Sequence, residues 1–229
     1  MNRPQVLINK VSLLVIVFYC LIALSSSAHA NELNITLNSI KPSHDYICPI
    51  DSVLSEKVET LLANDVNLSN LAKSKLLWQK SKVIFCKFGF SEDYLRQLKK
   101  ITQLPINEVD HNILSIAIYD LTEFYYNYSQ KKSCDFFYES QSALTDASQY
   151  FLKYLDMIEL RFCSELTPIE KIKSFFRLLE SNKGDNLFIS NAYLNIGEIY
   201  SSIGQYTLAA DIFKKQLTFI SDEYDIYWT

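Results

Sequence analysis

Apolar residues recur every three or four positions along most of the chain, which is the spacing of amphipathic helices. Leu54, Val58 and Leu61 show this spacing in the first such segment. In chain order, the predicted helices cover residues 51–63, 68–87, 91–103, 110–128 and a segment that starts at Thr167. With only 4 glycines among 229 residues, the sequence predicts an all-α protein whose helices are joined without long loops.

Several helix boundaries are marked by residues that satisfy the free backbone groups of a first turn. Ser91 and Asp110 each precede a predicted helix and are favoured N-cap residues. Thr167 is followed by proline and, three positions on, by Glu170, which is the pattern of a capping box. Residues 31–47 show no helical periodicity, so we expect an irregular segment there.

Residues 191–217 predict a tightly packed helical hairpin with its turn at Gly204-Gln205. Gly197 and Ala209 remove side-chain bulk where the two helices would cross. Larger residues flank these two positions and would fill the space beside the crossing: Tyr193, Ile196, Tyr200 and Phe213.

These small and large positions resemble one 34-residue tetratricopeptide (TPR) repeat, here residues 190–223. Residues 115–148 give a weaker match, with Thr122 and Cys134 at the small positions. The resemblance implies a right-handed stack of antiparallel helical hairpins, a TPR-like α-solenoid, over residues 48–229. An ordinary helical bundle would also place apolar residues at such spacings.

The N-terminus has the pattern of a secretory signal peptide. Arg3 and Lys10 precede an apolar run over 11–24, and small residues then lead to a cleavage site before Asn31. The run is shorter than the ~20 residues that span a bilayer, and no later run is long enough. We therefore expect residues 1–30 to be removed, no membrane span in the exported chain, and a location in the bacterial periplasm.

Charge and motifs narrow the classes of function. Removing Arg3 and Lys10 leaves 20 basic against 26 acidic residues, a formal charge of −6, which disfavours nucleic acid as a partner. No phosphate-binding glycine loop or dinucleotide fingerprint occurs. The Ser-x-x-Lys spacing of Ser129 and Lys132 lacks the companion motifs of penicillin-recognising enzymes. The sequence predicts no enzyme and no cofactor.

The exported chain would contain four cysteines, an even number that suits an oxidising compartment: Cys48, Cys86, Cys134 and Cys163. A turn signal at 64–67 lies midway between the first two cysteines. The second two have their midpoint near Ser148. Helical hairpins with these turns predict the disulfides Cys48–Cys86 and Cys134–Cys163.

Free buried thiols and zinc are the alternatives to disulfides. The cysteine spacings are long and contain no Cys-x-x-Cys, and only His44 and His111 follow residue 30. We expect no metal site.

In TPR stacks the first helix of each repeat lines a concave groove that holds a protein segment or a small ligand. The resemblance places two sets of residues on that face. The clearer repeat contributes Asn191, Leu194, Glu198, Ser201 and Ser202. The weaker one contributes Ile116, Tyr119, Glu123, Tyr126 and Asn127.

The chain also resembles the extracytoplasmic sensor regions of bacterial TPR-containing diguanylate cyclase-type signalling proteins. That resemblance implies a sensory binding module rather than a catalyst, because the cyclase signature is missing. An envelope-assembly or secretion scaffold would have the same sequence features, and a secreted hydrolase would need a catalytic cluster that we do not find. The next 34-residue unit would start at Tyr224, so we expect self-association or a C-terminal continuation.

Overall fold

The structure is a computed structural model that describes residues 33–40, 52–63, 68–141, 144 and 147–219. Every regular element among them is helical, which confirms the predicted all-α class. The elements are a helix over 33–39, α2 (Ser52–Ala63), α3 (Asn70–Phe88), α4 (Glu92–Thr102), the 3₁₀ turn η1 (Ile106–Glu108), α5 (His111–Tyr126), α6 (Gln130–Gln141), α7 (Gln149–Ile158), the π-helix η2 (Glu159–Cys163), α8 (Pro168–Ser181), α9 (Asn186–Ser202) and α10 (Tyr206–Leu217).

The predicted caps begin their helices. The Ser91 side chain accepts a hydrogen bond from the first turn of α4, and Asp110 does the same for α5. At α8, Thr167 and Glu170 form both hydrogen bonds of the capping box. The predicted turn at 64–67 and the signal peptide at 1–30 lie outside the described residues.

The expectation of an irregular segment over 31–47 is wrong for residues 33–39, which form a helix. Thr36 and Ile40 are buried, and Leu33 and Leu37 pack against the core. Leu33, Leu37 and Ile40 are spaced by four and then three residues, so they lie along one face of a helix. It is too short to stand out as a periodic pattern, and burial of this face stabilises it.

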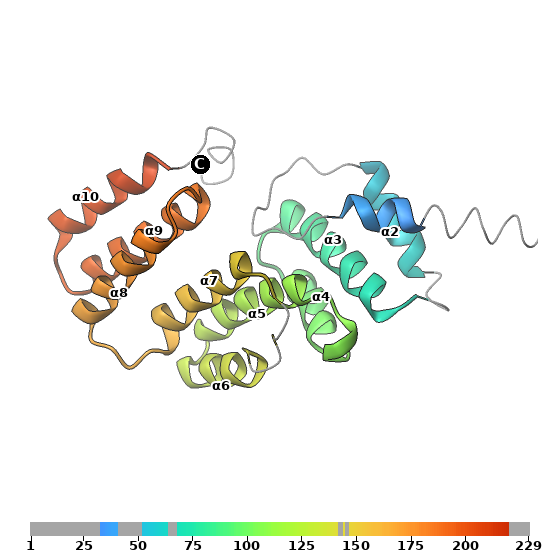
Figure 1. The fold of residues 1–229 in the computed structure, drawn as a ribbon, viewed down its shortest axis with the longest axis horizontal. Coiled ribbons are helices and arrows are strands. Elements are labelled where there is room, and N and C mark those ends of the chain that lie inside the picture. The colour runs from blue at the N-terminus through green and yellow to red at the C-terminus, as the bar shows by residue number, and fades with distance from the viewer. Residues whose placement is uncertain (1–32, 41–51, 64–67, 142–143, 145–146, 220–229) are drawn as a thin grey trace, which may run out of the picture.

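Two apolar clusters make up the core. The larger one runs from Ile40, at the end of the first helix, to η2 and includes the fully buried Trp78 and Phe137. The smaller one runs from α7 to α9 and α10 around Phe175 and Phe188. Tyr119 of α5 packs against both. Figure 1 accordingly shows α2–α4 at one end of the molecule, α8–α10 at the other and α5–α7 between them.

Helices α9 and α10 form the predicted hairpin, and Gly204 at its turn has a φ of 77°. A Cβ atom at Gly197 would lie 2.3 Å from Cε1 of Phe213, far closer than van der Waals contact allows. Ile196 and Ala209 are buried beside this crossing. The close approach of the two helices therefore depends on the absence of a side chain at residue 197.

Helices α5 and α6 approach closely through a hydrogen bond between two small buried residues. The hydroxyl of Ser133 donates to the carbonyl oxygen of Thr122 at 2.7 Å, and both residues are fully buried. Cys134, the next residue of α6, is bonded to Cys163 of η2. At this crossing, Ser133 therefore makes the hydrogen bond to α5, whereas the adjacent Cys134 is bonded to η2.

Within the described ranges, none of the helices combines the length and the apolar composition that crossing a membrane requires.

Candidate functional site

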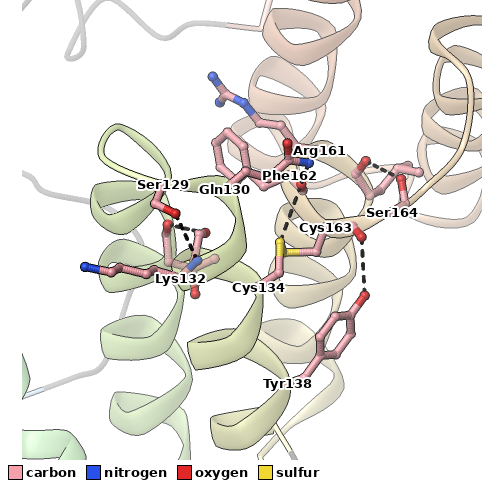
Figure 2. The surroundings of a disulfide bond; sticks show 12 residues. Ser129, Gln130, Lys132, Cys134, Tyr138, Arg161, Phe162, Cys163 and Ser164 are labelled. Carbon is pink, nitrogen blue, oxygen red and sulfur yellow. Dashed lines mark hydrogen bonds between the residues drawn. A yellow bond between two sulfur atoms is a disulfide. The ribbon is translucent and has the colours of Figure 1, made fainter.

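The predicted Cys134–Cys163 disulfide is present and joins α6 to η2, with the two Cα atoms 5.3 Å apart (Figure 2). Helix α7 begins at Gln149, directly after the predicted turn at Ser148. Cys86 is also disulfide-bonded. Its predicted partner, Cys48, lies outside the described residues, so the structure does not test that pairing.

The π-helix η2 directly continues α7. Its wider turn is closed by the amide of Ser164, which donates to the carbonyl oxygen of Glu159 at 2.8 Å. The Ser164 hydroxyl donates to the carbonyl oxygen of Leu160, also at 2.8 Å. Single π turns of this kind are uncommon and frequently occur at functional sites.

The last carbonyl groups of η2 accept hydrogen bonds from side chains of α6 and α8, two of them visible at the disulfide in Figure 2. The bonds run from Lys171 Nζ to Arg161 O at 3.0 Å, from Gln130 Nε2 to Phe162 O at 2.8 Å, and from Tyr138 Oη to Cys163 O at 3.5 Å. Burial lowers the pKa of the Lys171 ammonium. Together with the disulfide, these bonds fix η2 relative to both helices.

Arg161 projects from η2 and forms ion pairs with two glutamates. Its Nη2 atom lies 2.7 Å from Oε2 of Glu198 on α9, and its Nη1 atom lies 3.7 Å from Oε1 of Glu123 on α5. The guanidinium also lies over the ring of Phe162, 4.5 Å from the ring centre. We call Glu123, Arg161 and Glu198 the Arg161 junction. It links three elements that are distant in sequence.

Glu123 is the incompletely satisfied member of the Arg161 junction. At 3.7 Å its contact with Arg161 is too long for a hydrogen bond, and its carboxylate accepts none from the residues that the structure describes. Its side chain is 32% exposed. Burial raises the pKa of this carboxyl group, the nearby Glu198 carboxylate raises it further, and Arg161 opposes both.

An aromatic surface adjoins the Arg161 junction. The exposed ring of Tyr126 packs on Phe162, with ring centres 4.2 Å apart, and Asn127 follows it at the end of α5. Tyr119 lies deeper, with its ring edge-to-face against Tyr154. Burial raises the pKa of the Tyr119 hydroxyl, and the Glu123 carboxylate adds to that shift.

The structure brings together only part of the predicted groove. Glu123 and Glu198 meet through Arg161, whereas Ile116 is fully buried, so its prediction as a groove residue is wrong. The remaining candidates make no hydrogen bond or ion pair with the Arg161 junction: Asn191, Leu194, Ser201 and Ser202. Asn191 accepts from Asn195 at 2.7 Å, and Ser202 donates to Ile199 at 2.8 Å, both within α9.

Arg161 is the functional residue that the sequence analysis missed. It lies outside both repeat-like segments, and no feature of the local pattern distinguishes a π turn from an α turn. The one available signal is its position two residues before Cys163, whose predicted bond to Cys134 brings this part of the chain against α6.

In the part of the chain that the structure describes, no three His, Cys, Asp or Glu side chains are grouped so that they could hold a metal ion. A scan against protein-family models matches none, and searches of curated proteins and of solved structures also find no match.

Proposed function

We propose that this chain is an exported, non-catalytic TPR-like binding module that holds a segment of a partner protein in a groove along α5 and α9. The observation that carries the proposal is the Arg161 junction. Glu123 and Glu198 occupy equivalent positions in the two repeat-like hairpins, and their carboxylates converge on one side chain. Equivalent residues that converge on one face are what a repeat array needs in order to present a continuous binding surface.

The charges at the Arg161 junction indicate what the partner segment contributes. Two carboxylates face one guanidinium, so the three groups have a net charge of −1 when all are ionised. Glu123 has acceptor capacity that Arg161 does not use. A lysine or arginine of the partner would supply the missing donor, and the exposed face of Tyr126 would pack on its aliphatic stem.

The Cys134–Cys163 disulfide supports export, because disulfides persist in oxidising compartments such as the bacterial periplasm. The resemblance to sensor regions supports a sensory role for such a module. In that setting the bound segment would report the state of the envelope to a signalling partner.

The proposal is tested by selecting peptides from a random phage-displayed library on residues 31–229. Peptides of about 12 residues can extend to about 40 Å. We expect enrichment of peptides that contain lysine or arginine. Measured by fluorescence polarisation, Glu123→Gln should weaken binding of the selected peptides by about tenfold, because the carboxylate charge that strengthens the hydrogen bond is lost.

The matched control is Glu180→Gln, which removes an exposed carboxylate of α8. It should leave peptide binding unchanged, and the circular dichroism melts should show that both variants are folded. Failure to enrich any peptide, or equal weakening by the two variants, would refute the proposal.

A further inference from the structure

A second concave site lies away from the Arg161 junction, where the start of α7 faces the connection between α8 and α9. It is a cavity of about 660 Å³, within the size range of small-ligand sites. Tyr150 and Lys153 line it from α7, Asn182 and Asp185 line it from the α8–α9 connection, and Leu187 and Phe219 complete its apolar part. No residue of the Arg161 junction lines it.

An ion pair forms the largely buried, charged part of this cavity, whose polar lining also includes the exposed residues Ser181, Lys183 and Asn186. The ammonium group of Lys153 contacts Oδ2 of Asp185, and the two side chains are only 13% and 18% exposed. The same ammonium group lies 4.5 Å from the ring centre of Tyr150 and 5.1 Å from that of Phe188. Asp185 is also fixed in position, because it is the N-cap of α9 and its Oδ1 accepts a hydrogen bond from the backbone amide of Phe188. Both charges therefore have fixed positions.

A fixed, shielded pair of opposite charges selects its ligand by charge pattern. A simple anion would be attracted by Lys153 and repelled by Asp185, and a simple cation would be attracted by Asp185 and repelled by Lys153. The ammonium group of Lys183 is exposed, so solvent and salt screen its charge and it adds little to either contact. A ligand with its own adjacent positive and negative groups can align antiparallel to the pair, so that both contacts are attractive. Such contacts are stronger in a partly desolvated cavity than in open water.

We propose that this cavity binds a small zwitterion of the α-amino acid type. The ligand carboxylate contacts Lys153, and the ligand ammonium group contacts Asp185. The half-exposed rings of Tyr150 and Phe219 provide an apolar wall for the ligand side chain. This inference is independent of the proposed peptide groove, because the two sites share no residue.

The test uses L-phenylalanine as the probe and isothermal titration calorimetry on residues 31–229. Two analogues each lack one charged group: 3-phenylpropionate has no ammonium group, and phenethylamine has no carboxylate. We expect L-phenylalanine to bind and each analogue to bind at least about tenfold more weakly, since one charged contact is lost.

Two variants test the residues separately. Asp185→Asn removes the charge but keeps a side chain that caps helices well, and Lys153→Met keeps the aliphatic stem among the rings. Each variant should bind L-phenylalanine at least about tenfold more weakly than the wild type. Lys131→Met, which breaks an exposed ion pair with Asp135, is the matched control and should have no effect.

Thermal melts establish that each variant is folded before binding is compared. Absence of L-phenylalanine binding at about 10 mM would overturn the inference. Equal affinity for either analogue, or unchanged affinity after Asp185→Asn, would also overturn it. Because the peptide assay concerns other residues, a negative result here would leave the proposed peptide groove standing.

Discussion

Replacing Gly197 by alanine tests the packing of the α9–α10 hairpin directly. Alanine normally stabilises a helix interior by about 1 kcal/mol relative to glycine. Here the added methyl carbon would lie 2.3 Å from Cε1 and 2.7 Å from Cδ1 of Phe213. Ordinary van der Waals contact begins at 3.4 Å, so the ring would have to move by about 1 Å.

The two effects oppose each other, and their sizes decide the sign. Displacing a packed side chain by this amount costs about 1–3 kcal/mol. Phe213 is half-buried, so its ring has some freedom to move outward, which favours the lower half of that range. After subtraction of the gain in helix propensity, we expect Gly197→Ala to lower the free energy of unfolding by up to about 1 kcal/mol.

The same substitution made in a Phe213→Ala background provides the control. With the ring removed, the methyl group has room, and Gly197→Ala should raise the free energy of unfolding by about 1 kcal/mol. Urea unfolding at 25 °C, followed by circular dichroism, gives all four values of the double-mutant cycle. An effect of the same sign in both backgrounds, differing by less than about 0.5 kcal/mol, would show that Gly197 and Phe213 are not coupled and would refute the reasoning.

Three further predictions concern other parts of the fold. Replacing Cys134 and Cys163 together by serine opens a loop with a sequence separation of 29. Because the disulfide limits the conformations of the unfolded chain, its loss should lower the free energy of unfolding in urea by about 3–4 kcal/mol. A loss below about 1 kcal/mol would contradict this explanation. Burial raises the pKa of Glu123 above 4.5, so its contribution to stability is present below that pH and is lost as the pH rises through the folded value. Relative to Glu123→Gln, the melting temperature of the wild type should therefore fall from pH 4.5 towards neutrality, and a constant difference would argue against a raised pKa. Thr167→Ala removes the capping box of α8 and should cost about 1 kcal/mol in thermal or urea unfolding, whereas an unchanged stability would mean that the cap is replaced by water.

Features encoded by neighbouring residues were predictable from the sequence. Ser91, Asp110 and Thr167 each mark a helix start because their side chains satisfy amides two or three residues away. The Cys134–Cys163 bond was predictable for a related reason. Two consecutive helices with a turn midway between the cysteines leave few other arrangements.

Features that depend on distant contacts were not predictable. The helix over 33–39 has only one short apolar stripe, and it is the packing of Ile40 and its neighbours on the core that stabilises it. Ile116 occupies a position that a repeat register assigns to the groove. Packing of the neighbouring helices against α5 buries it instead.

The Arg161 junction shows why the candidate site was only half predictable. The register of the two hairpins identified Glu123 and Glu198 as equivalent, but not the residue between them. Arg161 reaches both because η2 adds a residue to its turn and because side chains from α6 and α8 hold the carbonyl groups of that turn. A π turn has no sequence pattern of its own, so its presence depends on those tertiary hydrogen bonds and on the disulfide. To predict such a site from sequence, one must therefore place the disulfide first. The residues beside its cysteines can then be considered as partners for charged side chains on the neighbouring helices.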